Sequence, residues 1–247
     1  MKKPLVLLTV ACLSLGLAAC GSKDEATSAT SGVAAGEAVP PPAGKQWSDV
    51  VVVTEKGGYL MGNPNAKVQL AEFGSYTCPH CGEFAEKSAD DIQKMVNTGK
   101  LSYEFRPFVR DPIDMTMTLI AGCAGPETYF PFSHQLFANQ TALFQTIQGK
   151  GDAAYSQAMG LPPKDRFLGL AELGGLIDFA KQRGIPEDKL KQCLADGKKA
   201  EAIAAQVQEA TSSYNITGTP TLLLNDKVVE NTATWEQLKP RLTEAGL

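Results

Sequence analysis

The tetrapeptide Cys78-Pro79-His80-Cys81 constrains this chain more than any other feature, because it lies where a strand pattern changes to a helix pattern. Residues 67–73 have the composition of a strand, and the apolar residues between 85 and 96 recur with helical spacing. The two cysteines are therefore expected at the start of a helix that directly follows a strand. This context predicts a redox-active dithiol.

The start of a helix favours a thiolate. Unpaired backbone N–H groups and the positive end of the helix dipole stabilise a negative charge there, so Cys78 is the expected nucleophile and the exposed, acidic thiol. Pro79 suits the first helical position, where no N–H is needed, and His80 adds a donor beside the sulfur. Cys81, on the inner side of the turn, is expected to be shielded and to resolve a mixed disulfide formed by Cys78.

Two other interpretations of the same spacing are weaker. A zinc site needs a second pair of ligands, and outside the motif and the first 20 residues the chain offers only Cys123, Cys193 and His134. A purely structural disulfide across so short a loop would remove little chain entropy. We therefore predict no metal, and no cofactor other than the redox-active disulfide itself.

Composition excludes several classes of protein. The 247 residues are 43% hydrophobic and 20% charged, which is ordinary for a soluble globular protein. The net charge is −4, or −6 without Lys2 and Lys3, and there is no basic cluster. Nucleic acid is therefore not an expected partner.

The first 46 residues read as a leader and a tether. Residues 1–19 combine two lysines with an apolar run too short to span a bilayer permanently, as in a secretory signal peptide. The run ends before Cys20 in a sequence that resembles the bacterial lipobox, which predicts lipid on Cys20; ordinary cleavage near Gly21 is the alternative. Residues 20–46 are then a flexible tether. The protein is expected to be exported and held on a membrane by this lipid alone, facing the periplasm or the cell exterior.

The remaining cysteines form two possible pairs. Six cysteines minus Cys12 in the leader and Cys20 leave four, of which two belong to the motif. Cys123 and Cys193 would form a structural disulfide in an oxidising compartment. Two buried, reduced cysteines that never meet remain the alternative.

The pattern after the tether predicts an α/β fold in three segments. Residues 47–110 hold strand patterns and the dithiol, residues 111–197 show only helical periodicity, and residues 198–247 read as a long helix, a strand, a hairpin turn, a strand and a helix. This order is that of a thioredoxin fold, divided into two halves by an inserted all-helical domain.

Four stretches together resemble the DsbA family of bacterial thiol:disulfide oxidoreductases, over residues 47–247. They are Gly62-Asn63-Pro64-Asn65-Ala66-Lys67-Val68, Glu72-Phe73, Cys78-Pro79-His80-Cys81 and Gly218-Thr219-Pro220-Thr221. None of these stretches is specific alone, but their order along the chain is.

The resemblance implies roles for three more residues. Pro220 would be a cis-proline beside the dithiol, leaving the Thr219 backbone free to bind an extended substrate segment; a plain Gly-Thr-Pro turn is the alternative. Glu72 matches a buried acid that manages the proton of the inner cysteine, and its pKa should be raised if it is dry; an exposed strand glutamate is the alternative. No chemical role is assigned to His134, expected to pack between helices, or to Trp47 and Trp235, expected at the surface or at an edge.

The expected function is that of a disulfide donor, an oxidase, for exported proteins that carry cysteine thiols. A depressed thiol pKa stabilises the reduced form and so makes the disulfide a better oxidant. The resemblance also implies a quinone-linked membrane protein as reoxidant, and we expect a monomer. Alternatives are a disulfide isomerase or reductase, a metal-delivery lipoprotein and a peptide-binding lipoprotein.

Overall fold

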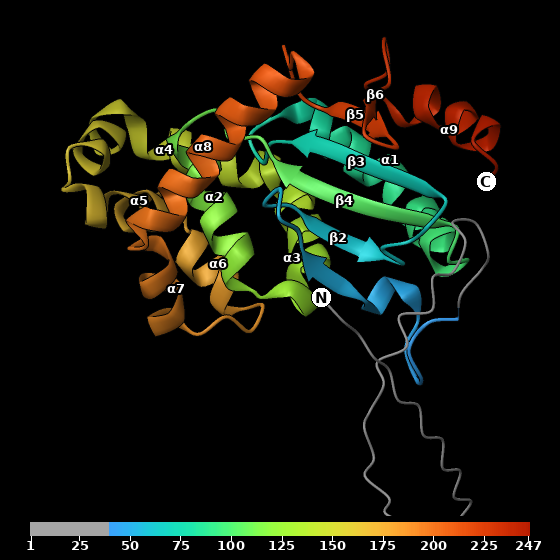
Figure 1. Ribbon diagram of the computed structural model, residues 1–247. Helices are drawn as coiled ribbons and strands as arrows, with labels where there is room; N and C mark the ends of the chain where they lie inside the picture. Colours follow the sequence, from blue (N-terminus) through green and yellow to red (C-terminus); the bar gives the residue numbers. More distant parts are fainter. Residues whose placement is uncertain (1–39) are drawn as a thin grey trace, which may run out of the picture. The chain divides into compact units, whose positions relative to one another are not determined.

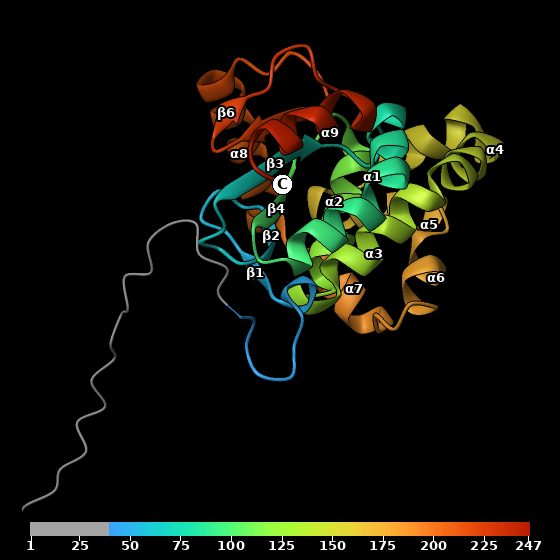
Figure 2. The same cartoon turned by 90° about the vertical axis from the view of Figure 1, so that its right-hand side faces the viewer.

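The computed structural model describes residues 40–247, and two views of it are given in Figures 1 and 2. The expected leader, most of the expected tether and Cys20 lie outside these residues. The helices follow a short 3-10 helix, Trp47–Asp49. They are α1 (Pro79–Asn97), α2 (Pro112–Cys123), α3 (Pro126–Ala138), α4 (Gln140–Met159), α5 (Pro163–Leu173), α6 (Leu176–Lys181), α7 (Glu187–Leu194), α8 (Gly197–Tyr214) and α9 (Trp235–Glu244).

One mixed sheet organises the fold, with the strand order β1-β2-β4-β3-β5-β6. Its strands are β1 (Val51–Val53), β2 (Tyr59–Gly62), β3 (Val68–Gly74), β4 (Leu101–Pro107), β5 (Thr221–Leu224) and β6 (Lys227–Val228). The central strands β3 and β4 are parallel and joined by α1, and the other neighbours are antiparallel. The expected α/β thioredoxin fold with its helical segment is confirmed.

Alternation along the central strands divides the core between the two faces of the sheet. Leu70, Tyr103 and Phe105 belong to the large cluster formed with α1 and α3. Phe73 and Leu223 belong to a smaller cluster that includes residues of α8. Figure 2 shows α1 and α3 on one side of the sheet. The dithiol, at the start of α1, therefore sits at the carboxyl end of β3.

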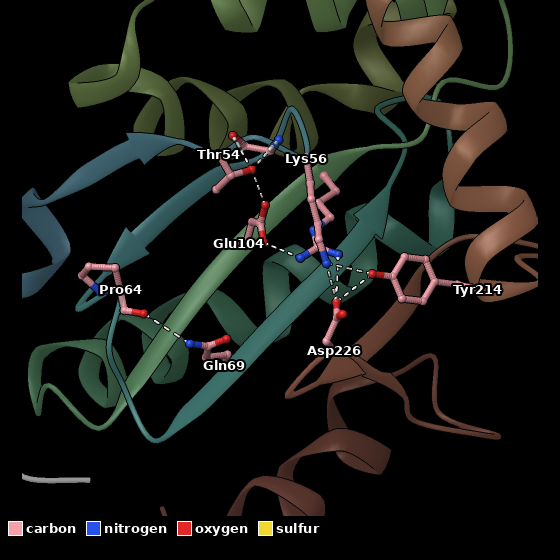
Figure 3. Close-up of polar contacts among 9 residues, drawn as sticks. Thr54, Lys56, Pro64, Gln69, Glu104, Tyr214 and Asp226 are labelled. Carbon is pink, nitrogen blue, oxygen red and sulfur yellow. Dashed lines mark hydrogen bonds and ion pairs between the residues drawn. The ribbon is translucent and has the colours of Figure 1, made fainter. Parts of the chain in front are cut away.

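Glu104 of β4 lies on the face of the sheet opposite α1 and is held there by polar partners (Figure 3). Arg106 donates to Glu104 over 2.6 Å, and the Thr54 hydroxyl donates to the other oxygen of Glu104, also over 2.6 Å. Lys56 lies 2.7 Å from Asp226, so the β1–β2 turn is linked to the β5–β6 hairpin. This network covers part of the sheet face opposite α1, where the Arg106 guanidinium also lies 5.3 Å from the centre of the Phe73 ring.

A group of helices lies in the sequence between strands β1 to β4 and strands β5 and β6. Helices α2 to α7 lie between β4 and α8 in the chain, and Figure 1 shows α2 and α4 to α7 gathered beside the sheet. Cys123, at the end of α2, and Cys193, in α7, form a disulfide with their Cα atoms 5.9 Å apart. The bond ties an early helix of this segment to its last one.

The structure differs from a simple sequence pattern in three places. Strand β2 follows the Gly57-Gly58 turn but has no alternation, because three of its four residues are buried. The helical spacing across residues 173–180 belongs to two helices, since Gly175 adopts φ +67° between α5 and α6. Trp47 and Trp235 are buried rather than at the surface, and Trp235 packs edge-on against Phe84 of α1.

Candidate active site

Cys78 and Cys81 are both free thiols in the structure. Cys78 is the N-cap of α1, and Pro79 occupies the first turn as expected. Cys81 is fully buried, and Cys78 is also buried, with 3% of its surface exposed. The expectation of an exposed Cys78 was therefore wrong. The loop that carries Thr219 covers it: the Cys78 sulfur lies 3.2 Å from the Thr219 carbonyl oxygen. The two thiols differ in electrostatics much more than in exposure.

The pKa of Cys78 is lowered to about 5. The largest cause is the hydrogen bond with the Cys81 thiol, which favours the Cys78 thiolate; burial opposes it. Thr219 and the backbone N–H groups of His80 and Cys81 lower the pKa further. These N–H groups are the unpaired donors of the first helical turn, as the sequence pattern predicts.

The pKa of Cys81 is raised, first because burial penalises its charged form and then because Cys78 and Glu72 place negative charge nearby. Glu72 of β3 is 1% exposed, and burial raises the pKa of its carboxyl group to about 8. Glu72 Oε2 accepts a 2.6 Å hydrogen bond from the Tyr103 hydroxyl, while Oε1 has no partner among the described residues. A buried acid with a free oxygen can therefore take or give a proton in this interior.

The Thr219–Pro220 peptide bond is cis, and Pro220 is buried where β5 begins. Residues far apart in the sequence thus meet at the dithiol, since Thr219 and Cys78 are 141 positions apart. Thr219 itself is partly exposed. Its backbone is therefore positioned to contact a molecule that approaches Cys78.

The side chain of His80 does not lie beside the Cys78 sulfur, where the sequence pattern placed it. Its ring is 77% exposed, and Nδ1 lies 3.7 Å from Glu83 Oε2. No hydrogen bond joins the ring to the Cys78 sulfur among the contacts between described residues. His80 acts on the thiol through its backbone N–H in this state.

An acid at the start of the helical segment fixes the loop before the dithiol, and sequence reasoning missed it. Asp114 of α2 accepts hydrogen bonds from the Ser75 hydroxyl (2.6 Å) and from the backbone N–H groups of Tyr76 (2.9 Å) and Arg110 (3.0 Å). Burial raises its pKa to about 7. The helix-start signature Asp111-Pro112 was visible in the sequence, but nothing local to it points to residues 39 positions away.

Gln140, the first residue of α4, holds the same loop from another side. Its Nε2 donates to the carbonyl oxygens of Tyr76 (2.8 Å) and Cys78 (3.0 Å), and the side chain is buried. A Cβ at Gly82 would lie 3.1 Å from Gln140 Oε1, so this glycine permits the close approach. The helical segment therefore positions the backbone of the nucleophile.

Metal ligands are not gathered here or elsewhere in residues 40–247, where no group of three or more His, Cys, Asp or Glu side chains could hold an ion. Across the same residues, no helix combines the length and the apolar character needed to cross a bilayer. His134 lies in α3, partly buried, and burial lowers its pKa.

Comparison with known proteins gives one family. The family model described as Thioredoxin matches residues 54–244. A crystal structure of a protein-disulfide isomerase from Novosphingobium aromaticivorans is 34% identical, has a TM-score of 0.73, and aligns over 77% of this chain and 98% of that chain. The alpha-DsbA1 structure of Wolbachia pipientis shares the fold, with a TM-score of 0.57, 23% identity, and coverage of 75% of this chain and 87% of that one.

A curated relative from Rickettsia bellii, whose name places it among the protein-disulfide oxidoreductases, is 25% identical over 178 residues. The match covers 72% of this chain but 60% of that relative's length. The family assignment therefore rests on the family model and on the Novosphingobium structure, together with the four stretches in their expected order. The chain belongs to the thioredoxin family, among the DsbA-type protein-disulfide oxidoreductases that its sequence resembles.

Proposed function

We propose that the protein exchanges disulfides with cysteine-containing polypeptides through Cys78 and Cys81, and that it acts as a disulfide donor. The observation that carries this proposal is the contrast between the two thiols. Cys78 has a pKa of about 5, whereas the pKa of the fully buried Cys81 is raised. Near neutral pH one sulfur is a thiolate and a good leaving group, and the other keeps its proton.

The proposed exchange takes place in two steps. A substrate thiolate attacks Cys78 Sγ of the oxidised protein, the Cys78–Cys81 bond breaks, and Cys81 leaves as a thiolate that takes a proton from Glu72. A second substrate thiolate then attacks the substrate sulfur of the mixed disulfide and releases Cys78 as a thiolate. The substrate loses two electrons and gains a disulfide, and the protein gains those two electrons as a dithiol.

Stabilisation of the Cys78 thiolate favours donation of the disulfide to a substrate. A thiol with a pKa near 5 is almost fully ionised at pH 7, which stabilises the reduced protein by about 2.7 kcal/mol relative to an unionised thiol. For a two-electron couple this raises the reduction potential by about 60 mV. The oxidised protein is therefore the form that tends to give up its disulfide.

An isomerase or a reductase is the second candidate. The Novosphingobium relative is described as a protein-disulfide isomerase, and the chemistry of its first step would be the same. An isomerase uses the reduced protein, in which Cys78 attacks a wrong substrate disulfide. The stability of the reduced form favours this use where the compartment keeps the protein reduced.

The proposed setting is outside the cytoplasm, with lipid on Cys20 holding the domain at a membrane surface. Substrates would be exported proteins, and a membrane protein linked to quinones would reoxidise the dithiol. No cofactor besides the redox-active disulfide is proposed. Mass spectrometry of the mature N-terminus tests the anchor: a protein that begins after Cys20 would remove it from this account.

Oxidation of a reduced, unfolded protein that contains cysteines tests the activity. Stoichiometric oxidised wild type should form disulfides in the substrate, Cys78→Ser should form none, and Cys81→Ser, mixed with a substrate disulfide, should accumulate a covalent complex with it. Refolding of a substrate with scrambled disulfides by the reduced protein separates the second candidate. A Cys78→Ser variant as active as wild type would favour a peptide-binding role or metal delivery instead.

A further inference from the structure

A groove runs along α1 directly from the dithiol, on the side of α1 that faces α3 and α4. Its volume is about 510 Å³, and its lining begins at Pro79, next to the nucleophile. The α1 wall then continues along one face of the helix to Ala89. Thr219 and Pro220 do not line it, so it is separate from the backbone site expected beside Cys78.

The floor and the rim of the groove differ in character. The floor includes Ala85, Ala89 and Phe137 together with the buried Gln140, whereas the α1 rim carries the exposed acids Glu83 and Glu86. No lysine or arginine is among the described residues that line it. The groove is therefore mainly apolar below and negative at its edge.

Few basic groups lie near this rim. Within residues 40–247 no ion pair involves Glu86, and the partner of Glu83 is the exposed His80 ring at 3.7 Å. Lys87 of α1 is paired with Glu236 over 3.1 Å, which is the largest cause of its raised pKa, and the charges of Glu83 and Glu86 raise this pKa further. Burial lowers the pKa of His134 in the opposite wall, which disfavours a positive charge on its ring. A second cavity of about 480 Å³ shares His134 and continues toward Lys45, which is itself paired with Glu127.

The dimensions fit an extended polypeptide. Pro79 and Ala89 are ten residues apart on a helix, a distance of about 15 Å, which an extended chain spans with four or five residues. Glu83 and Glu86 lie about 7 and 12 Å along the helix from Cys78. These positions correspond to substrate residues two to four places from the cysteine bonded to Cys78.

We propose that this groove binds the segment of an unfolded substrate next to its reacting cysteine, and selects segments with a lysine or arginine two to four residues away. A long basic side chain can lay its methylene groups on the apolar floor and place its charge between the two carboxylates. The inference rests on the proposed thiol exchange and adds to it a preference among substrates. Charge complementarity at a rim acts mainly on association and weakens with salt.

The test compares two peptides that carry the same cysteine pair, one with lysines and one with serines two to four residues away on both sides. Each is oxidised by the full oxidised chain, and second-order rates are measured at low salt. Wild type should oxidise the lysine peptide about threefold to tenfold faster than the serine peptide. The difference should shrink at high salt.

Glu83→Gln/Glu86→Gln should remove the preference by slowing the lysine peptide alone, and Glu86→Gln should remove part of it. The matched control is Glu201→Gln/Glu209→Gln, which makes the same change in net charge on the exposed surface of α8. Ala138→Lys, at an exposed position in the groove lining, should slow the lysine peptide too. Iodoacetamide labelling of reduced Cys78 should be equal in all variants, which shows that the nucleophile is intact.

Two outcomes would overturn the proposal that the groove selects basic segments. One is equal oxidation rates for both peptides with wild type, and the other is an equal loss of the preference in the α8 control. If Glu83→Gln/Glu86→Gln slows oxidation of the serine peptide as much as that of the lysine peptide, the substitutions act on the dithiol in general. That result would also overturn the proposal. If wild type oxidises neither peptide, the proposed function fails first, and that result is distinct from oxidation without a charge preference.

Discussion

The Tyr103 hydroxyl donates a 2.6 Å hydrogen bond to Glu72 Oε2 in the interior between the sheet and α1. The two residues lie on adjacent parallel strands, β4 and β3, and both are buried. Tyr103 is paired with Leu70 and Glu72 with Phe105, so the hydrogen bond runs diagonally between the strands. Burial raises the pKa of Glu72 to about 8, and this hydrogen bond keeps it from rising further. The pair therefore sets the pH at which a base becomes available to Cys81.

Tyr103→Phe should move that pH upward. Loss of a hydrogen bond to a buried carboxylate costs about 1.5–3 kcal/mol, or about one to two pKa units. The pH profile for release of a small thiol from its mixed disulfide with Cys78 should shift to higher pH by that amount. Tyr155→Phe, toward the end of α4 opposite to Gln140, is the control. A loss of rate that is the same at every pH would mean that Tyr103 contributes packing only.

Gln140→Met should destabilise the protein by about 1–3 kcal/mol, because it keeps the volume of the side chain but leaves the carbonyls of Tyr76 and Cys78 without their donor. Urea unfolding of the oxidised form measures this, with the exposed Gln145→Met on the same helix as control. Equal midpoints for the two variants would show that this amide does not hold the loop.

Asp114→Asn should flatten part of the pH dependence of stability. The folded pKa of Asp114, about 7, lies above its ordinary value of 3.8, so the folded protein binds more protons than the unfolded chain between about pH 4 and pH 7. Wild type should therefore lose stability relative to the variant as pH rises through this window. Unfolding free energies at pH 4.5 and 7 test it; a difference between the two proteins that does not change with pH would contradict the assignment.

Removal of the Cys123–Cys193 disulfide should cost up to about 4 kcal/mol, because the bond closes a loop of 70 residues in the unfolded chain. Cys123→Ala/Cys193→Ala should unfold at lower urea concentration while its Cys78 alkylation profile stays as in wild type. A changed Cys78 profile would show instead that the bond supports the active site directly.

The dithiol was predictable from the sequence because its chemistry depends on local order: a strand, two cysteines three residues apart, and a helix. The helical segment was predictable for the same reason, since periodicity is a local signal. The four stretches that resemble DsbA proteins located Glu72 and Pro220 without any contact information.

The residues that hold the loop were not predictable. Asp114 and Gln140 act through tertiary contacts with Ser75, Tyr76 and Cys78, and no spacing along the chain encodes these. The burial of Cys78 was missed because the cover comes from Thr219, 141 residues away. Likewise, the burial of Trp235 could not be predicted, because it depends on the contact of α9 with Phe84 of α1.

The equilibrium reduction potential of the Cys78–Cys81 couple tests the central claim most directly. It can be measured at pH 7 in glutathione buffers by trapping free thiols with a reagent that adds mass. Because the Cys78 thiolate stabilises the reduced form, we predict a potential less negative than about −240 mV. This threshold is the middle of the range of about −220 to −260 mV found for cytosolic glutathione by extraction. A value at or below about −270 mV, as in reducing thioredoxins, would contradict the account of a disulfide donor.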